Sequence, residues 1–271
     1  SSLAECNFVN LKDRFWEHDG LGLNPDPRCS TCLKLPPCKS CKLLTHPVSY
    51  KEQQEAVLIK NSMEFDYDKR EVRVAYPYLR DPREVSLNAQ LPKGPSALSN
   101  LLHVMLRFRA RPYLLVADLK KAYWSITASK QDSHMRRFLW YRQEDLQKEN
   151  APLRVFAMLK LGMGDRISQY CLEEAKLEIA RYASSELGEK EFAVKLMASS
   201  YVDDIVPSFE GKNEAENFKK ILPEAFGALG FEFKEIYLTG PGIKVPECEP
   251  AHMFGHIVDL NEDKIYLKFS V

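Results

Sequence analysis

The sequence contains no uninterrupted apolar run close to the roughly 18 residues needed to cross a bilayer. It also has no net charge, because 38 Lys and Arg residues balance 38 Asp and Glu residues. A neutral chain is not expected to attract nucleic acid over its whole surface, although it can still carry a local basic patch. Residues 1–20 carry charges where a secretory signal has an apolar core. These absences predict a cytoplasmic or nuclear protein with no membrane association.

The bulk composition indicates an ordinary soluble, folded protein. Hydrophobic residues make up 45% of the 271 residues and charged residues 28%, values typical of globular domains. This length suits one large domain, or one domain with a small appendage. The chain has no internal repeat and no low-complexity tract. We divide it into a cysteine-rich segment (1–48), a mixed connecting region (49–93) and a more regular domain (94–271).

Four cysteines in CSTCLKLPPCKSC have the spacing C-x2-C-x5-C-x2-C. Thiolates paired in this way suit a closed, tetrahedral zinc site, which can staple a segment that has no core of its own. We therefore predict structural Zn²⁺ on Cys29, Cys32, Cys38 and Cys41, with reduced surface thiols as the alternative. Without a secretory signal, a disulfide framework is the less expected interpretation.

Apolar residues follow regular patterns from about residue 91 onward. RPYLLVADL is a continuous apolar run bounded by Pro112, as in a buried central strand. SQYCLEEAKLEIARYA is typical of a helix capped by Ser168, with Leu172, Ala175 and Ile179 facing inward. AVKLMASSYVDDIVPSF predicts two short strands around a turn.

Further helices and strands complete the predicted fold. A helix is expected behind Ser49, with Glu52 at the capping-box position. PSALSNLLHVMLRFR has helical spacing, and a third helix starts at an Asn213–Glu216 capping box and contains Pro223. Strands are expected in REVRVAYPYL, FEFKEIYLTG and KIYLKFSV. Together these elements predict an α+β fold, an antiparallel sheet with helices on one face.

Two adjacent carboxylates, Asp203 and Asp204, lie between short apolar runs in SSYVDDIVPS. Like charges side by side are unfavourable near a hydrophobic layer. One interpretation is a polar turn at a hairpin tip, and the other is a divalent-metal site. Asp118, at the end of the buried strand, either caps a turn or converges with Asp203 and Asp204. Three converging carboxylates can hold two divalent ions about 4 Å apart for phosphoryl transfer.

The pair ADLKKAYWSI and YVDDI resembles reverse transcriptases, whose palm has an Asp on a strand and a Tyr-x-Asp-Asp hairpin. With KGPSALSNLLHVMLRFR before it, the chain is most similar to the enzymes of BEL/Pao-type LTR retrotransposons. LKLGMGDRISQYCLEEA is similar to the motif that opens the helix contacting template and primer. LGFEFKEIYLTG resembles the segment that places a Lys near the nucleotide, and HMFGHIVDLNEDKIYLKFSV resembles the palm's closing strands. The resemblance runs in order along nearly the whole chain.

The resemblance implies a reverse-transcriptase palm in residues 94–271 and two-metal RNA-directed DNA polymerisation on an RNA/DNA template-primer. Asp118, Asp203 and Asp204 would bind Mg²⁺ or Mn²⁺. Lys234 would act as general acid toward the leaving pyrophosphate, or be a solvated lysine on a polar strand face. Tyr123 would lie under the sugar and reject a 2′-OH, or be a core aromatic.

The same resemblance assigns four further residues to the nucleotide or template: Gly164, Arg166, Ser168 and Tyr201. These assignments depend on the resemblance alone.

One departure from the family concerns the fingers, which should lie between segments that are nearly contiguous here, at residues 74–95. Fingers normally bring cations to the triphosphate, and the basic residues nearby are Arg73, Arg80, Arg83 and Lys93. A second hypothesis is therefore a domesticated, catalytically inactive module that binds protein or RNA. A protein partner or a second copy would then cover the surface left by the missing fingers. A third is a zinc-stapled regulatory protein unrelated to polymerases.

Overall fold

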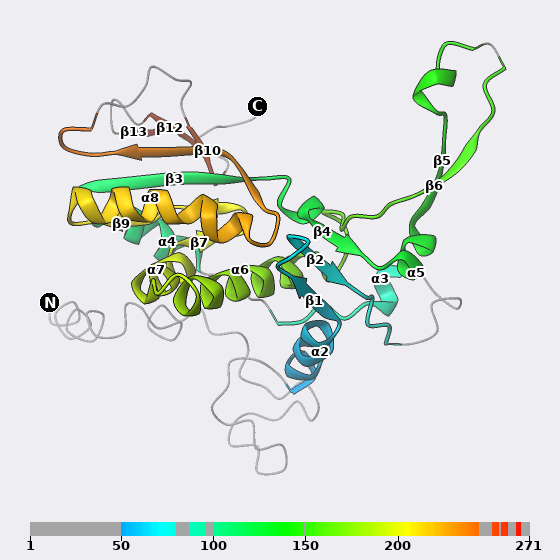
Figure 1. The fold of residues 1–271 in the computed structure, drawn as a ribbon, viewed down its shortest axis with the longest axis horizontal. Coiled ribbons are helices and arrows are strands. Elements are labelled where there is room, and N and C mark those ends of the chain that lie inside the picture. The colour runs from blue at the N-terminus through cyan, green and yellow to red at the C-terminus, as the bar shows by residue number, and fades with distance from the viewer. Residues whose placement is uncertain are drawn as a thin grey trace, which may run out of the picture.

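The structure is a computed structural model, and it describes residues 50–79, 87–95, 100–148, 150–243, 251–254, 256–259 and 264–266. The predicted zinc ligands lie outside the described residues: Cys29, Cys32, Cys38 and Cys41. The described part is an α+β fold with antiparallel sheets and packed helices (Figure 1). No helix within it is both long and apolar enough to cross a bilayer.

The central sheet is built around the strand that the apolar run predicted. β3 (Tyr113–Lys120) lies between β10 (Glu232–Thr239) and the short β8 (Asp204–Ile205), antiparallel to both. β7 (Ser200–Tyr201) pairs with β8, and β9 (Ser208–Phe209) pairs with the start of β3. The expectation of a buried central strand is confirmed.

Helices α6 (Ser168–Ser185) and α8 (Lys212–Gly227) cover one face of this sheet, and α7 (Lys190–Ala198) packs against α6 (Figure 1). Leu115 and Ala117 of β3 are buried in the same core cluster as residues of these helices. This cluster is the main core of the protein.

The opposite face of β3 is also covered by a helix. Val104 and Phe108 of α4 (Leu101–Phe108) are buried in a second cluster with Leu114 and Val116 of β3. Helices therefore lie on both faces, where we expected them on one. The reason is the continuous apolar run of β3, which leaves both of its faces in need of burial.

Two predicted helix starts are wrong in detail. Ser168 is the first residue of α6 and Ile167 occupies the N-cap position, so Ser168 does not cap the helix. α8 begins one residue before Asn213, behind Gly211, and no side chain caps it, so the Asn213–Glu216 capping box does not form. The inward face of α6, Leu172, Ala175 and Ile179, is fully buried as predicted.

A second, smaller sheet follows the first helix. After α2 (Tyr50–Asn61), β1 (Met63–Asp66) and β2 (Glu71–Val74) form a hairpin, and β4 (Ile126–Ala128) adds to β2 in parallel. β11 (Ala251–Met253), β12 (His256–Asp259) and β13 (Lys264–Tyr266) form a third, antiparallel sheet near β10 and β3 (Figure 1). The short helical segments are α3 (Leu87–Gln90), η2 (Ala122–Ser125), α5 (Lys130–Ser133), η3 (His134–Arg136) and η4 (Gln143–Asp145).

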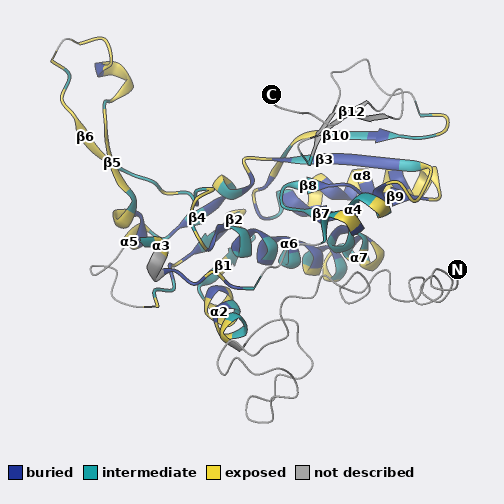
Figure 2. Ribbon diagram, turned by 180° about the vertical axis from the view of Figure 1, so that it is seen from behind, coloured by how far each residue is buried: buried dark blue, intermediate teal, exposed yellow. Residues whose placement is uncertain are grey.

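A two-stranded arm projects from the body of the protein. β5 (Arg137–Trp140) and β6 (Arg154–Ala157) pair only with each other among the described strands and extend away from the sheets (Figure 1). Figure 2 shows the arm as mainly exposed, and Leu139, Trp140 and Val155 are 60%, 57% and 64% exposed. An isolated hairpin with this much apolar surface is marginally stable in water.

Candidate functional site

The Asp203–Asp204 pair lies in a tight hairpin. β7 and β8 pair so that Tyr201 faces Asp204, which leaves Val202 and Asp203 as the two turn residues. Val202 has a φ of +53°, a left-handed conformation that is a genuine outlier for a β-branched residue. The predicted strand–turn–strand is confirmed for residues 200–205, but residues 193–198, expected as part of the first strand, belong to helix α7.

Asp118 lies beside this hairpin. Its Cα pairs with that of Asp204 across the antiparallel strands β3 and β8, and the Leu119 N–H donates a hydrogen bond to the Asp203 carbonyl at 3.1 Å. Asp118, Asp203 and Asp204 are all half-buried. The structure therefore brings together, at one end of the central strand, the three carboxylates that were expected to converge.

Burial and mutual repulsion act on the carboxylate of Asp204. The pKa of Asp204 is raised to about 7, mainly by burial, and the negative charges of Asp203 and Asp118 contribute to this rise. The Phe254 N–H opposes this rise, because it donates a hydrogen bond to Asp204 Oδ2 at 2.9 Å. A carboxylate held in this way is one that a bound cation would stabilise.

Asp118 experiences the same effects and has a cation beside it. Burial, followed by the charge of Asp203, raises the pKa of Asp118, while the charge of Lys234 lowers it. Lys234 lies in β10 where the register slips between Phe233 and Glu235, so it is the extra residue of a β-bulge opposite the Asp118 end of β3. Bulges of this kind re-aim side chains beside functional sites. The ammonium of Lys234 is exposed, and its charge acts on Asp118.

The three carboxylates have the chemistry of a magnesium site without its arrangement. Hard carboxylate oxygens are the protein ligands that Mg²⁺ and Mn²⁺ prefer. Within the described ranges, however, no group of three or more His, Cys, Asp or Glu side chains is arranged to hold an ion, and Asp204 Oδ2 accepts the Phe254 N–H. An ion shared by Asp118, Asp203 and Asp204 would need these side chains to turn toward one another.

Two tyrosines flank the hairpin. Tyr123 in η2 is half-buried, and burial followed by the charges of Asp203 and Glu173 raises its pKa. Tyr123 therefore lies near Asp203 and also packs against the main core. Tyr201 is half-buried, and its ring packs edge-on against that of Phe254, with the ring centroids 5.6 Å apart.

The loop before α6 holds the remaining residues that the resemblance assigned to nucleotide or template. Gly164 and Arg166 are exposed, and Asn88 bonds both: it donates to the Gly164 carbonyl at 2.8 Å and accepts from the Arg166 N–H at 3.1 Å. Ser168 is buried, and its hydroxyl donates to the Gly162 carbonyl at 2.6 Å. The serine therefore fixes the loop, whereas Gly164 and Arg166 face outward.

A basic pocket of about 560 Å³ lies at the same end of β3 as the three carboxylates. Five cations line it: Lys69, Arg70, Lys120, Lys121 and Lys160. Two carboxylates also line it, those of Glu71 and Glu232, together with Trp124, Ser125 and Gly230. Lys120 is two residues beyond Asp118 on β3, so the pocket adjoins the carboxylates along the same strand. Cations therefore outnumber carboxylates at a concave surface, as suits a phosphorylated ligand.

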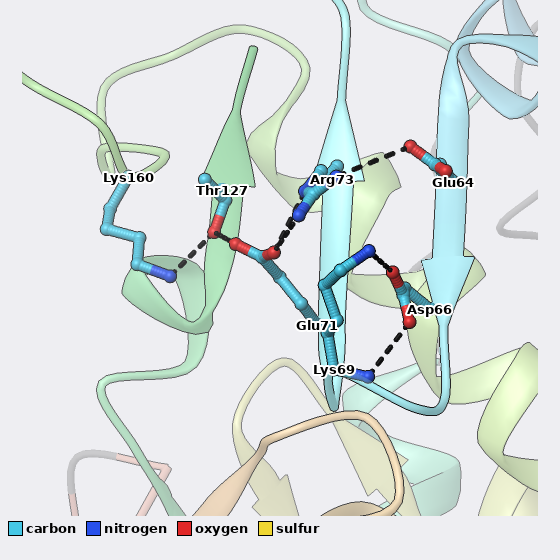
Figure 3. Close-up of polar contacts among 7 residues, drawn as sticks. All are labelled: Glu64, Asp66, Lys69, Glu71, Arg73, Thr127 and Lys160. Atoms are coloured by element: carbon cyan, nitrogen blue, oxygen red, sulfur yellow. Dashed lines mark hydrogen bonds and ion pairs between the residues drawn. The ribbon is translucent and has the colours of Figure 1, made fainter. Parts of the chain in front are cut away.

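Figure 3 shows how the small sheet orders one wall of this pocket. Lys160 Nζ donates to the Thr127 hydroxyl at 2.7 Å, and that hydroxyl donates to Glu71 Oε1 at 2.6 Å. Glu71 also forms an ion pair with Arg73 at 2.7 Å. Arg73 therefore pairs with a carboxylate of its own strand and does not line the pocket.

Sequence reasoning missed this pocket. Arg80 and Arg83, two of the basic residues named for this role, lie outside the described residues, and the Lys93 N–H donates to Glu55 at 3.0 Å. The signals present in the sequence were the basic runs DKR and LKK. They are some 50 residues apart, and nothing in their local pattern shows that they meet.

No protein-family model and no curated protein matches the chain. Among solved structures, one that matches is the foamy viral protease-reverse transcriptase in complex with RNA/DNA hybrid, with a TM-score of 0.45 and 16% identity. The match covers 69% of this chain and 21% of that chain, so this chain spans about a fifth of its length. Similarity this low does not establish a shared fold or function, so any functional conclusion depends on the motifs and the site.

Proposed function

We propose that this chain is a reverse-transcriptase-like domain of the BEL/Pao type. In its competent form it adds deoxynucleotides to a primer on an RNA template by phosphoryl transfer. The observation that carries the proposal is the convergence of Asp118 with the strained turn that bears Asp203 and Asp204. The order of the sequence motifs supports it, because the residues expected to act together come from segments about 85 residues apart.

Asp118, Asp203 and Asp204 would hold the divalent cations, Mg²⁺ or Mn²⁺, which when bound neutralise phosphate charge and activate the primer hydroxyl. Tyr123, near Asp203, would contact the sugar of the nucleotide and exclude a 2′-OH. Lys234, in the bulge opposite the Asp118 end of β3, would protonate the leaving pyrophosphate. Each of these roles is assigned to a residue that lies at or near the carboxylates.

The basic pocket supplies a feature that the shortened fingers region was expected to lack. Phosphoryl transfer depends on cations that bind the phosphates and stabilise developing charge. Lys69 and Arg70, from the β1–β2 turn, and Lys120 and Lys121, from the end of β3, line one concave surface. We propose that this surface binds the phosphates of the nucleotide or template-primer, which lets a neutral chain engage nucleic acid locally.

Primer extension on an annealed RNA template with dNTPs and Mg²⁺ or Mn²⁺ tests the proposal. The chain should extend the primer, and the Asp203→Asn/Asp204→Asn variant should not. A Glu191→Gln/Glu224→Gln variant, which removes two exposed carboxylates on α7 and α8, is the matched control and should retain activity. Absence of extension by the folded, unmodified chain would contradict the enzymatic proposal.

A second candidate function, binding without catalysis, is favoured by the exposed arm. Phe138, Leu139, Trp140 and Val155 place apolar side chains on both faces of a hairpin that has no further strand beside it among the described residues. A domesticated, inactive module would use such a surface to bind protein, RNA or a second copy of itself. Sedimentation analysis distinguishes the two candidates: a discrete dimer or RNA complex in a chain without extension activity supports binding.

We also propose that the N-terminal segment holds structural Zn²⁺ on Cys29, Cys32, Cys38 and Cys41 and that the protein acts in the cytoplasm or nucleus. Metal analysis of the purified chain should give one zinc per molecule. A Cys29→Ser/Cys32→Ser variant should lose it, and a Cys171→Ser variant, which changes a buried cysteine elsewhere, should not.

A further inference from the structure

A buried lysine lies directly beneath the Asp203 hairpin. Lys176 of α6 has a side chain that is 1% exposed. Its ammonium lies 2.7 Å from Glu173 Oε1 and donates a hydrogen bond to the Val202 carbonyl at 3.0 Å. Full burial lowers the pKa of Lys176, while the charges of Glu173 and Asp203 raise it. Few lysines in proteins are buried to this extent, so the contact with Val202 invites an explanation.

Val202 is the residue of the hairpin that most needs support. Its φ of +53° is unfavourable for a β-branched side chain. A turn in such a conformation persists only when its surroundings fix it. The carbonyl that Lys176 binds belongs to the peptide group joining Val202 to Asp203. The lysine therefore fixes the orientation of that peptide group. Because the Asp203 nitrogen belongs to the same group, the backbone orientation of Asp203 is fixed with it.

Stability alone does not account for the Lys176–Glu173 pair. Burial raises the pKa of Glu173 and lowers that of Lys176, so both ions are desolvated. Replacing a buried ion pair by apolar residues of similar volume is often neutral or stabilising. The feature that an apolar pair could not reproduce is a hydrogen bond to the Val202 carbonyl.

We propose that Lys176, oriented by Glu173, is a positioning residue that holds the Val202–Asp203 peptide group and so keeps the Asp203 carboxylate beside Asp118. The consequence for catalysis rests on the proposed function, whereas the consequence for the turn does not. The Leu119 N–H, which donates to the Asp203 carbonyl at 3.1 Å, reports on the turn directly.

The test combines amide hydrogen exchange at Leu119 with primer extension. A Lys176→Met/Glu173→Leu variant removes both buried charges together, which avoids leaving one ion unpaired. We expect exchange at Leu119 to accelerate at least tenfold while the amides of α6 keep their rates, and extension to fall at least tenfold. The matched control is Lys195→Met/Glu214→Leu, another ion pair on the same face of the sheet, and it should change neither measurement.

Glycine at position 202 provides the decisive second variant. Adding Val202→Gly to the paired variant removes the unfavourable φ of valine, so Leu119 protection and extension should recover at least in part. Val202→Gly alone, with the lysine in place, also removes a side chain that packs against the main core, so it serves as the reference for the triple variant. Unchanged exchange at Leu119 in the paired variant would overturn the inference, and so would an acceleration by the paired substitution that is equally large with and without Val202→Gly. If the unmodified chain extends no primer, the proposed polymerase function fails, and the exchange data alone decide the positioning role.

Discussion

Asp118 and Asp204 face each other as directly paired residues on adjacent antiparallel strands. Two carboxylates opposite each other in a sheet repel, and burial adds to their destabilisation. Lys234, in the neighbouring strand, offsets part of this repulsion at Asp118. The pairing of the Asp118 and Asp204 carboxylates is unfavourable without a bound cation and favourable with one. A cation should therefore change the stability of the protein measurably.

We predict that Asp118→Asn stabilises the metal-free protein by about 0.5 kcal/mol, because it removes one of two opposed charges. Urea unfolding with and without Mn²⁺ measures this. Mn²⁺ should raise the unfolding midpoint of the unmodified chain and leave that of Asp118→Asn unchanged. Asp68→Asn, an exposed carboxylate in the β1–β2 turn, should behave as the unmodified chain. Equal metal-induced shifts in both variants would contradict a site that includes Asp118.

Lys234→Gln should lower the rate of primer extension about 100-fold while lowering the unfolding free energy by no more than about 0.5 kcal/mol, through loss of its attraction to Asp118. General acids contribute factors of this size, and the side chain is exposed, so its removal leaves no cavity. Lys220→Gln, at an exposed position of α8, is the matched control. A fall in rate that is the same in both variants would mean that overall charge matters and that the bulge position does not.

Local patterns in the sequence predicted the central features of this site. The apolar run behind Pro112 defined β3, and the carboxylate pair after a short apolar segment defined the turn. Such features are local, because one strand or one turn is specified by its own residues. The error at residues 193–198 has a local cause as well, since a short apolar segment fits a strand and a helix equally.

Other parts of the site depend on contacts between distant segments, which a single sequence does not reveal. The basic pocket requires the β1–β2 turn to meet the end of β3. Lys176 falls within a predicted helix, but its contact with Val202 depends on how that helix packs beneath a hairpin 26 residues later. Helix α4 was wrongly expected on the same face of the sheet as the other helices. Periodicity shows which side of a helix is buried, but it does not show which face of the sheet that side packs against.

Glu71→Gln should destabilise the protein at neutral pH and not in acid. Hydrogen bonds from Thr127, and then from Arg73, lower the pKa of Glu71 below its ordinary value of 4.5. Stability from a lowered carboxyl pKa is fully present above the unfolded-state value and is lost as pH falls through the folded-state value. We therefore expect a difference of about 1 kcal/mol at pH 7 that begins to decline near pH 4.5 and is lost once the pH falls below the lowered pKa of the folded state. A difference that is constant from pH 7 to about pH 3 would contradict this account.

Trp140→Ser and Leu139→Ser should leave the unfolding free energy within about 0.5 kcal/mol, because both side chains are more than half exposed on the arm. If the arm binds a partner or a second copy, the same variants should weaken that association. Sedimentation velocity over a range of protein concentrations, with and without single-stranded RNA, measures this. Val194→Ser, an exposed apolar position on α7, is the control and should leave association unchanged.

Gly227 and Gly230 are three residues apart but have opposite surroundings. Gly230 has a φ of +77°, and a Cβ added there would come within 2.1 Å of the Arg70 carbonyl in the β1–β2 turn. Gly230→Ala should therefore lower the unfolding free energy by about 3 kcal/mol and weaken phosphate binding, since both residues line the basic pocket. Gly227, the last residue of α8, has open space around its Cβ position, so Gly227→Ala should raise stability by up to about 1 kcal/mol. Equal effects of the two substitutions in thermal unfolding would show that the close approach of Arg70 to Gly230 does not hold the pocket together.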